Sequence, residues 1–192
     1  MKKMTTLFKK DPNDLGRVIN EVDPLNEWAL TKGVVTIKRD GTACAVIDGL
    51  LYKRFDLKKG RTLPLLAIPC QEPDLITGHH PHWVPCIRDN PADKYHWEAW
   101  DRFMNAEGNR RFQDGTYELC GPKVNGNHEQ LNIHVLIKHG NGEVIFGDVT
   151  YESIQKYLLR EDIEGYVFHH PDGRMCKIRK KDFGMKRGDI KV

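Results

Sequence analysis

The sequence predicts an α+β fold built mainly from antiparallel sheets, with few helices. Short apolar runs with the two-residue alternation of a β-strand recur along the chain, and Asp-Gly or Asn-Gly turns follow several of them. Only two segments have the apolar spacing of an amphipathic helix. The chain has 192 residues, 39% of them apolar, which suits a single domain over residues 1–192, with room for a sizeable insertion.

The first regular structure is expected between residues 33 and 55, as a meander of three antiparallel strands. Each apolar run alternates along its length, and an Asp-Gly pair, a frequent hairpin turn, separates successive runs. The expected strands are 34–37, 43–47 and 50–55, joined by the turns Asp40-Gly41 and Asp48-Gly49.

The segment at 58–93 is rich in Pro, His and Gly and has little periodicity, so we expect a loop with one short strand at 65–68. A helix is predicted at 95–106, because Trp97, Trp100 and Phe103 share one face of it. We interpret the two tryptophans as core residues rather than as platforms for base stacking.

The last part of the chain combines one helix with short strands. The helix is predicted at 151–160, with Thr150 as its N-cap and with Ile154 and Leu158 on its buried face. Strands are expected at 116–120, 131–138, 144–146, 164–169 and 175–180, the last two joined by the turn Pro171-Asp172-Gly173.

Composition narrows the classes of protein. The longest apolar runs, such as residues 63–68, are far shorter than a membrane span, and Met1-Lys2-Lys3 is not followed by an apolar signal core. We therefore expect a soluble, cytoplasmic protein without a membrane partner. The net charge is only +3, yet residues 174–192 contain eight Lys or Arg against two Asp. Such a cluster is either a solvated tail or a surface for the phosphates of a polyanion.

The five cysteines are odd in number and include no C-x-x-C pair, so neither a disulfide framework nor a Cys-rich zinc site is predicted. Three histidines, His79, His80 and His82, lie near Cys86 in the sequence. They could be arranged as metal ligands, although a polar loop rich in His and Pro explains them equally well.

Lys38 is the candidate nucleophile, because it ends an apolar β-type run and precedes Asp40-Gly41. The end of a strand holds a side chain firmly while leaving it accessible to a ligand. A lysine amine must first lose its proton, which at pH 7 requires roughly 4 to 5 kcal/mol from surroundings that disfavour the ammonium. We therefore expect other cations, or a metal ion, near Lys38.

Two carboxylates and a pair of cations could complete such a site. Glu118 lies between large apolar neighbours in a strand and so points to the opposite face, where it could accept bonds from sugar hydroxyls. Glu164 begins an apolar strand beside Gly165 and suits Mg²⁺. Lys177 and Arg179 share one strand face and could neutralise a phosphate while lowering the pKa of Lys38. Taken singly, each is also explained as an ordinary solvated strand residue.

The order of these segments resembles the covalent lysine nucleotidyltransferases, which comprise ATP-dependent DNA ligases, RNA ligases and mRNA capping guanylyltransferases. Lys38-Arg39-Asp40-Gly41 looks like motif I of that superfamily, and Arg54 stands where the following motif has its arginine. Glu118 resembles motif III, residues 164–167 resemble motif IV, and Lys177-Ile178-Arg179 resembles motif V. Arg179 stands where a second lysine is common in motif V.

Within this superfamily, residues 51–58 and 169–175 look like the compact vertebrate-type 5′-3′ RNA ligases. The resemblance implies a nucleotidyltransferase (ATP-grasp-like ligase) domain with its motifs between about 33 and 184. Because the sequence ends eight residues after Gly184, we expect no C-terminal OB-fold.

The resemblance also implies the roles of the site residues. Lys38 would carry AMP, and Glu164 would contact Mg²⁺ or Mn²⁺. Phe146 could stack on adenine, although a core position is the favoured interpretation. The residues expected to contact ATP are Ile37, Asp40, Gly41, Arg54, Glu118, Phe146, Lys177 and Arg179.

The function expected from this resemblance is ATP-dependent RNA ligation. Lys38 would form lysyl-AMP, and AMP would pass to an RNA 5′-phosphate that a 3′-hydroxyl then attacks. One alternative is GTP-dependent guanylyl transfer to RNA ends, as in capping. The other is a non-catalytic RNA-binding module. The sequence does not give the oligomeric state, and a monomer is the default expectation.

Overall fold

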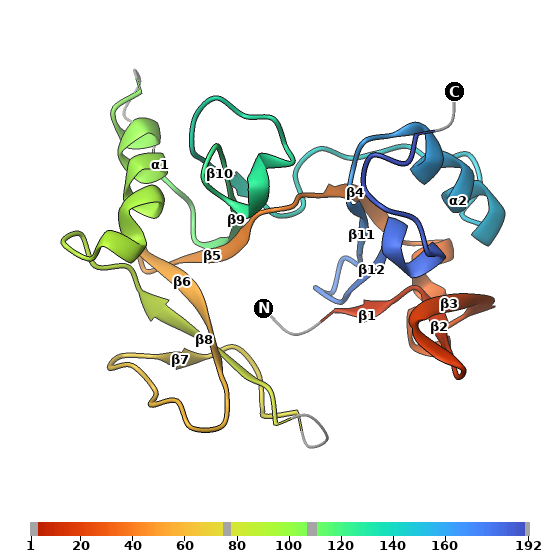
Figure 1. Ribbon diagram of the computed structural model, residues 1–192, viewed down its shortest axis with the longest axis horizontal. Helices are drawn as coiled ribbons and strands as arrows, with labels where there is room; N and C mark the ends of the chain where they lie inside the picture. The colour runs from red at the N-terminus through yellow and green to blue at the C-terminus, as the bar shows by residue number, and fades with distance from the viewer. Residues whose placement is uncertain (1–3, 75–77, 107–110, 191–192) are drawn as a thin grey trace. The chain divides into compact units, whose positions relative to one another are not determined.

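The computed structural model describes residues 4–74, 78–106 and 111–190 (Figure 1). By their contacts these residues divide into two compact units. Unit 1 contains Asp40–His139, and unit 2 combines Met4–Arg39 with Gly140–Val192. The boundary between residues 39 and 40 falls inside the predicted Lys38-Arg39-Asp40-Gly41 motif.

Unit 2 is organised around a four-stranded sheet with the order β1-β12-β11-β4. Both partners of β11 run antiparallel to it, whereas β1 pairs with β12 in parallel. The bounds are Thr5–Thr6 for β1, Val34–Lys38 for β4, Gly165–His169 for β11 and Met175–Arg179 for β12. The strands predicted at 34–37, 164–169 and 175–180 are therefore confirmed to within one residue at each end.

Alternation gives this sheet one apolar and one polar face. Val35, Phe168 and Cys176 are register neighbours on the apolar face, and all three are buried in one core cluster. Helix α2, Tyr151–Arg160, adds Ile154 and Leu158 to the same cluster. The predicted helix is thus confirmed, and so is its N-cap, since Thr150 accepts a bond from the backbone N–H of Ser153. The opposite, polar face carries Lys38, Lys177 and Arg179.

The rest of unit 2 comes mainly from residues 4–30, where no helix or strand was predicted. Strands β2, Phe8–Asp11, and β3, Asp14–Val22, form a separate antiparallel pair, followed by the 3-10 helix η1, Pro24–Leu30. Leu7 and Phe8 are buried in the core cluster of the unit. A second 3-10 helix, η4, Lys180–Phe183, follows β12 directly.

Unit 1 contains a six-stranded sheet with the order β10-β9-β5-β6-β8-β7, antiparallel throughout. Helix α1 packs against β10 in this unit (Figure 1). The bounds are Thr42–Ile47 for β5, Leu50–Leu57 for β6, Ile68–Pro69 for β7, His80–Pro85 for β8, Gly115–Cys120 for β9 and Val135–Lys138 for β10, with Pro91–Asp93 for η2, Lys94–Met104 for α1 and Asn125–Asn127 for η3.

The predicted three-strand meander is wrong at its first connection. Strands β5 and β6 form the expected hairpin, and Asp48 and Gly49 have the positive φ angles of 50° and 72° that a tight hairpin turn requires. Strand β4, however, pairs with β11 rather than with β5. Gly41 is not among the glycines with positive φ, so Asp40-Gly41 leads from one unit into the other instead of closing a hairpin.

Other strand predictions differ in extent. Strand β8 lies within the segment predicted as a loop, and its residues pair with β6. The sequence did not indicate this strand, because Pro81 and Pro85 obscure its alternation. The strand expected at 65–68 is reduced to β7, and the one expected at 131–138 begins only at Val135. Residues 144–146 form no strand, although Glu143 makes an isolated bridge to Thr36.

The coarse prediction of an α+β fold with mostly antiparallel sheets and few helices is confirmed, since the described residues contain only two α-helices. Helix α1 begins and ends within two residues of its prediction. Its most buried residues are His96 and Ala99, whereas Trp97 and Trp100 are partly buried against the neighbouring core cluster. Across residues 4–74, 78–106 and 111–190, no helix is long and apolar enough to cross a membrane.

Candidate functional site

Lys38 lies at the end of β4 on the polar face of the sheet in unit 2. Its register neighbour on β11 is Gly165, whose own partner on β12 is Arg179. A Cβ atom on residue 165 would lie 2.1 Å from the carbonyl oxygen of Ile178. The close approach expected beside Glu164 therefore exists, and what approaches Gly165 is the backbone of β12. This packing places Lys38 and Arg179 on either side of a residue without a side chain.

The amine of Lys38 is bound by a carboxylate. Its Nζ lies 2.5 Å from Oε2 of Glu164, the residue immediately before β11, and it also contacts the carbonyl oxygen of Arg39 at 3.5 Å. The side chains of Lys38 and Glu164 are 19% and 23% exposed, so solvent or a ligand can reach both. The two residues predicted as nucleophile and metal contact are thus direct neighbours.

Lys177 on β12 extends this polar face. Burial of β12 alternates strictly, with Cys176 and Ile178 in the core and with Lys177 and Arg179 partly exposed, as the sequence predicted. Burial, together with the positive charges of Arg179 and Lys38, lowers the pKa of Lys177 from 10.5 to about 8. The strand register thus places Lys38, Lys177 and Arg179 on one face of the sheet, so that cations surround Lys38 as predicted.

Arg179 is held by a residue that the sequence interpretation missed. Its Nε and Nη2 donate to the two carboxylate oxygens of Asp182 at 3.0 Å, and its backbone N–H donates to Asp182 at 2.9 Å. Lys10 donates to the same carboxylate at 2.8 Å. Burial alone would raise the pKa of Asp182, but the bonds from Arg179 and Lys10 outweigh it and hold this pKa below its usual value. The three-residue spacing between Arg179 and Asp182 is the feature of the sequence that could have indicated this ion pair.

Gly41 and Glu118 meet in unit 1. The backbone N–H of Gly41 donates to Oε1 of Glu118 at 3.2 Å. A Cβ atom on residue 41 would lie 2.2 Å from the carbonyl oxygen of Leu119, so glycine is required by the close approach of β9. Asp40, which precedes Gly41, also makes polar contacts within unit 1. Its backbone N–H donates to Glu129 at 3.1 Å, and its carboxylate accepts from Asn125 at 3.4 Å.

Glu118 occupies the face that alternation predicted. Tyr117 and Leu119 are buried, whereas the side chain of Glu118 is 13% exposed. Its second oxygen contacts Nε2 of His139 at 3.0 Å, and Nδ1 of that ring contacts the hydroxyl of Thr116 at 2.9 Å. His139 therefore orients Glu118, a role for which nothing in the sequence pattern provided a signal.

The two remaining predicted contacts lie in different units. Arg54 on β6 has its guanidinium 5.8 Å from the ring centre of Trp83 and its Nε 3.3 Å from Asp56. Phe146, in unit 2, packs edge-on against Tyr157 and Tyr166 at centroid distances of 4.9 and 4.8 Å. These contacts agree with a core position for Phe146, and its stacking on adenine stays a prediction.

The structure therefore brings the predicted residues together in two groups. Lys38, Glu164, Lys177 and Arg179 gather on the polar face of the sheet in unit 2, whereas Ile37 is in register with Tyr166 and lies on the apolar face. Asp40, Gly41 and Glu118 gather around the start of β5 in unit 1, and Arg54 lies on β6 of the same sheet. No protein-family model matches the chain, and no curated protein sequence matches it significantly.

Proposed function

We propose that the chain is an ATP-dependent RNA ligase in which Lys38 is the nucleophile. The observation that carries this proposal is the polar face of unit 2, where the amine of Lys38 lies 2.5 Å from Glu164 and close to the charge of Lys177. Supporting it is the resemblance of the motifs around these residues to the covalent lysine nucleotidyltransferases.

The charge of this face suits a nucleoside triphosphate. Four cations, Lys10, Lys38, Lys177 and Arg179, are gathered around two carboxylates, Glu164 and Asp182. Among the described residues no carboxylate pairs with Lys177, so its charge is available to a ligand. A bound phosphate would relieve the mutual repulsion of these cations and would be held by charge-assisted hydrogen bonds.

Glu164 fits the carboxylate expected to contact Mg²⁺ or Mn²⁺. Its side chain is partly exposed, and oxygen ligands of this type are the ones that Mg²⁺ prefers. A magnesium ion there would offset negative charge on the phosphates of ATP. Glu164 would hold the Lys38 amine in place before the nucleotide binds and would give up that contact when the amine attacks.

The first chemical step would be adenylyl transfer. The Nζ atom of Lys38 forms a bond to the α-phosphorus of ATP while the bond from that phosphorus to the bridging oxygen breaks, and pyrophosphate leaves with the electron pair. The amine proton passes to solvent. Lys177 lies beside Lys38 and would stabilise the charge that develops on the phosphate oxygens.

The later steps would transfer AMP to RNA. An oxygen of an RNA 5′-phosphate displaces the Lys38 nitrogen from phosphorus, and a 3′-hydroxyl then attacks the activated 5′-phosphate and releases AMP. The proposal assigns ribose contact to Glu118 and phosphate or ribose contact to Arg54. Asp40 would help to position Lys38 or a metal-bound water, and its contacts to Asn125 and Glu129 hold it in place.

The test is incubation with α-³²P-ATP or α-³²P-GTP and Mg²⁺, followed by a denaturing gel, and then incubation with RNA that bears a 5′-phosphate and a 3′-hydroxyl. The variants are wild type, Lys38→Ala and, as a matched control, Lys156→Ala on the exposed face of α2. The proposal predicts ATP labelling and RNA joining for wild type and Lys156→Ala, and neither for Lys38→Ala.

Each alternative gives a different result in the same experiment. Labelling by GTP alone would replace the proposal with capping-type guanylyl transfer. Salt-dependent RNA binding that survives Lys38→Ala, with no covalent nucleotide on protein shown by intact mass to be free of prior adenylylation, would leave a binding module instead.

A further inference from the structure

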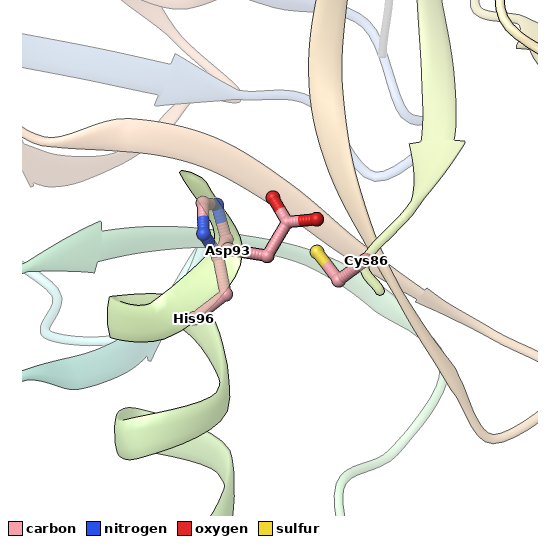
Figure 2. Close-up of side chains that lie close together, drawn as sticks. All are labelled: Cys86, Asp93 and His96. Carbon is pink, nitrogen blue, oxygen red and sulfur yellow. The ribbon is translucent and has the colours of Figure 1, made fainter. Parts of the chain in front are cut away.

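A cluster of three potential metal ligands lies in unit 1, separate from the residues assigned to nucleotide chemistry. Cys86 directly follows β8, Asp93 ends η2, and His96 lies in the first turn of α1. One ligand atom from each lies within 4.8 Å of the others. Figure 2 shows the carboxylate of Asp93 between the imidazole of His96 and the sulfur of Cys86. The elements that meet here are adjacent in sequence, so their geometry is set locally.

All three side chains are buried. Their exposed fractions are 8% for Cys86, 0% for Asp93 and 7% for His96. A buried carboxylate and imidazole are costly unless hydrogen bonds or a metal ion satisfy them. Burial at this position therefore distinguishes the cluster from the acidic groups that commonly gather on protein surfaces.

His96 provides the observation that points to a ligand. Both ring nitrogens are buried, and neither has a hydrogen-bond partner among the residues that the structure describes. An imidazole in its neutral form has one nitrogen with a free lone pair, which is the form that coordinates a metal ion. An unpaired buried polar group costs about 1 to 3 kcal/mol, and coordination of a metal ion would remove that cost.

Asp93 is already oriented by its neighbours. Lys53 contacts Oδ1 at 2.5 Å, and the backbone N–H of Ile87 donates to Oδ2 at 2.9 Å. Each carboxylate oxygen can accept a further interaction, and such outer contacts commonly orient metal ligands. The ammonium of Lys53 opposes a second cation, so its removal should strengthen metal binding.

One member of the cluster, His96, lies at a cavity. His96 lines a cavity of about 230 Å³ together with Thr42, Tyr95 and Lys123. The cavity is large enough for water molecules, so a metal ion bound by three protein ligands could take water as its fourth ligand.

We propose that Cys86, Asp93 and His96 bind one Zn²⁺ ion. One sulfur, one nitrogen and one oxygen form a donor set that suits this borderline-soft ion better than Mg²⁺ or Ca²⁺. The Cys86 thiol gives its proton to solvent on binding, because the thiolate is the form that coordinates metal. From the sequence, Cys86 was considered as a possible metal ligand together with His79, His80 and His82. In the structure His79 instead contacts Asp56 at 3.2 Å.

The test measures metal binding by the full-length protein, with no reference to ligase activity. Protein freed of metal by a chelator is titrated with Zn²⁺ and, separately, with Co²⁺, whose bond to a thiolate gives an intense near-ultraviolet charge-transfer band. We expect one metal ion per chain and this band for wild type. Cys86→Ser should abolish the band, and both Cys86→Ser and His96→Gln should weaken zinc binding at least about tenfold. Cys70→Ser, a control at a partly buried cysteine outside the cluster, should leave both unchanged.

Lys53→Met keeps the test decisive if a ligand variant fails to fold. Without the competing ammonium, zinc should bind more tightly to this variant than to wild type, and added zinc should raise its melting temperature by the larger amount. Wild-type protein that binds less than one zinc per chain, or that shows no cobalt–thiolate band, would overturn the proposal. Equal zinc affinity of wild type, Cys86→Ser and His96→Gln, all folded, would overturn it as well.

Discussion

Two carboxylates hold cations at the same end of the four-stranded sheet in unit 2, and they do so in different surroundings. Glu164 precedes β11 and its carboxylate pairs with Lys38, with both side chains about one-fifth exposed. Asp182 follows β12 in η4, is fully buried, and accepts bonds from Arg179 and Lys10. Since Arg179 and Lys38 flank Gly165 in register, the two ion pairs are close neighbours.

This difference separates a structural ion pair from one that can open. A buried carboxylate with two cationic partners is costly to disturb, because each partner left behind is an uncompensated charge. A partly exposed pair can exchange its contact for water or a ligand at little cost. We therefore expect Asp182 to fix the position of Arg179, while Lys38, Glu164 and Lys177 carry the chemistry.

The largest effect that would separate the two pairs is on stability. Asp182→Asn should lower the free energy of unfolding by about 3 to 5 kcal/mol, because Arg179 and Lys10 lose their shared counter-charge. Glu164→Gln should cost at most about 1 kcal/mol, as is usual for partly exposed pairs. Urea unfolding of both variants beside wild type measures the difference. Equal costs would show that the comparison between the two pairs is mistaken.

A second effect concerns acid. The pKa of Asp182 lies below its ordinary value of 3.8, so its contribution to stability is present above about pH 4 and is lost as pH falls through the lowered pKa. The gap in stability between wild type and Asp182→Asn should therefore shrink as the pH is lowered below about 4. Urea midpoints measured along this pH series test the trend, with exposed Glu27→Gln as the control that should follow wild type. A gap that does not change with pH would exclude Asp182 as the source.

A third and smaller effect concerns ligand binding by Lys177. Because its pKa is lowered to about 8, its charge is lost as pH rises through that value. The affinity for an ATP analogue with an α,β-methylene bridge should fall about tenfold between about pH 7 and 9.5, equivalent to about 1.4 kcal/mol. Lys177→Arg should keep its affinity over this range, since a guanidinium stays charged. Calorimetric titration can measure the affinity of both proteins for the analogue. A wild-type affinity that is independent of pH would contradict the role of Lys177 in binding phosphate.

Lys177 also affects the free energy of unfolding at alkaline pH. A lysine in an ion pair contributes less to stability as pH rises, whereas Lys177 should have the opposite effect. Its folded pKa lies below its unfolded value, so between about pH 8 and 10.5 the folded chain binds fewer protons than the unfolded chain. This group alone makes the free energy of unfolding rise with pH in that window. Wild type should therefore gain stability relative to Lys177→Met across it, as measured by urea unfolding. A constant difference would mean that Lys177 is not desolvated as described.

Local signals in the sequence were sufficient for much of unit 2. Alternation located β11 and β12, and Thr150 with the apolar spacing after it located α2, because these elements are fixed by neighbouring residues. The pairing of β4 with β11 was not predictable in this way, since it joins residues more than a hundred positions apart. Partner choice between strands depends on the packing of the whole unit rather than on either strand alone.

Two of the Asp-Gly pairs, at residues 40–41 and 48–49, show the same limit at the level of a dipeptide. Asp48-Gly49 adopts positive φ angles and closes a hairpin, whereas Gly41 is needed for the close approach of Leu119. The sequence letters are identical, and only the packing partner differs. For the same reason, His139 and Asp182 were missed, because their importance comes from the partners that the fold brings to them.

The most direct test of the central claim is to locate the nucleotide on the chain. After incubation with ATP and Mg²⁺, the protein is digested and its peptides are sequenced by tandem mass spectrometry under conditions that preserve a phosphoramidate bond. We predict AMP on Lys38 in wild type, and no AMP on any lysine in Lys38→Ala. AMP on another lysine, or no AMP on wild-type protein that was free of nucleotide at the start, would contradict the role of Lys38 as the nucleophile.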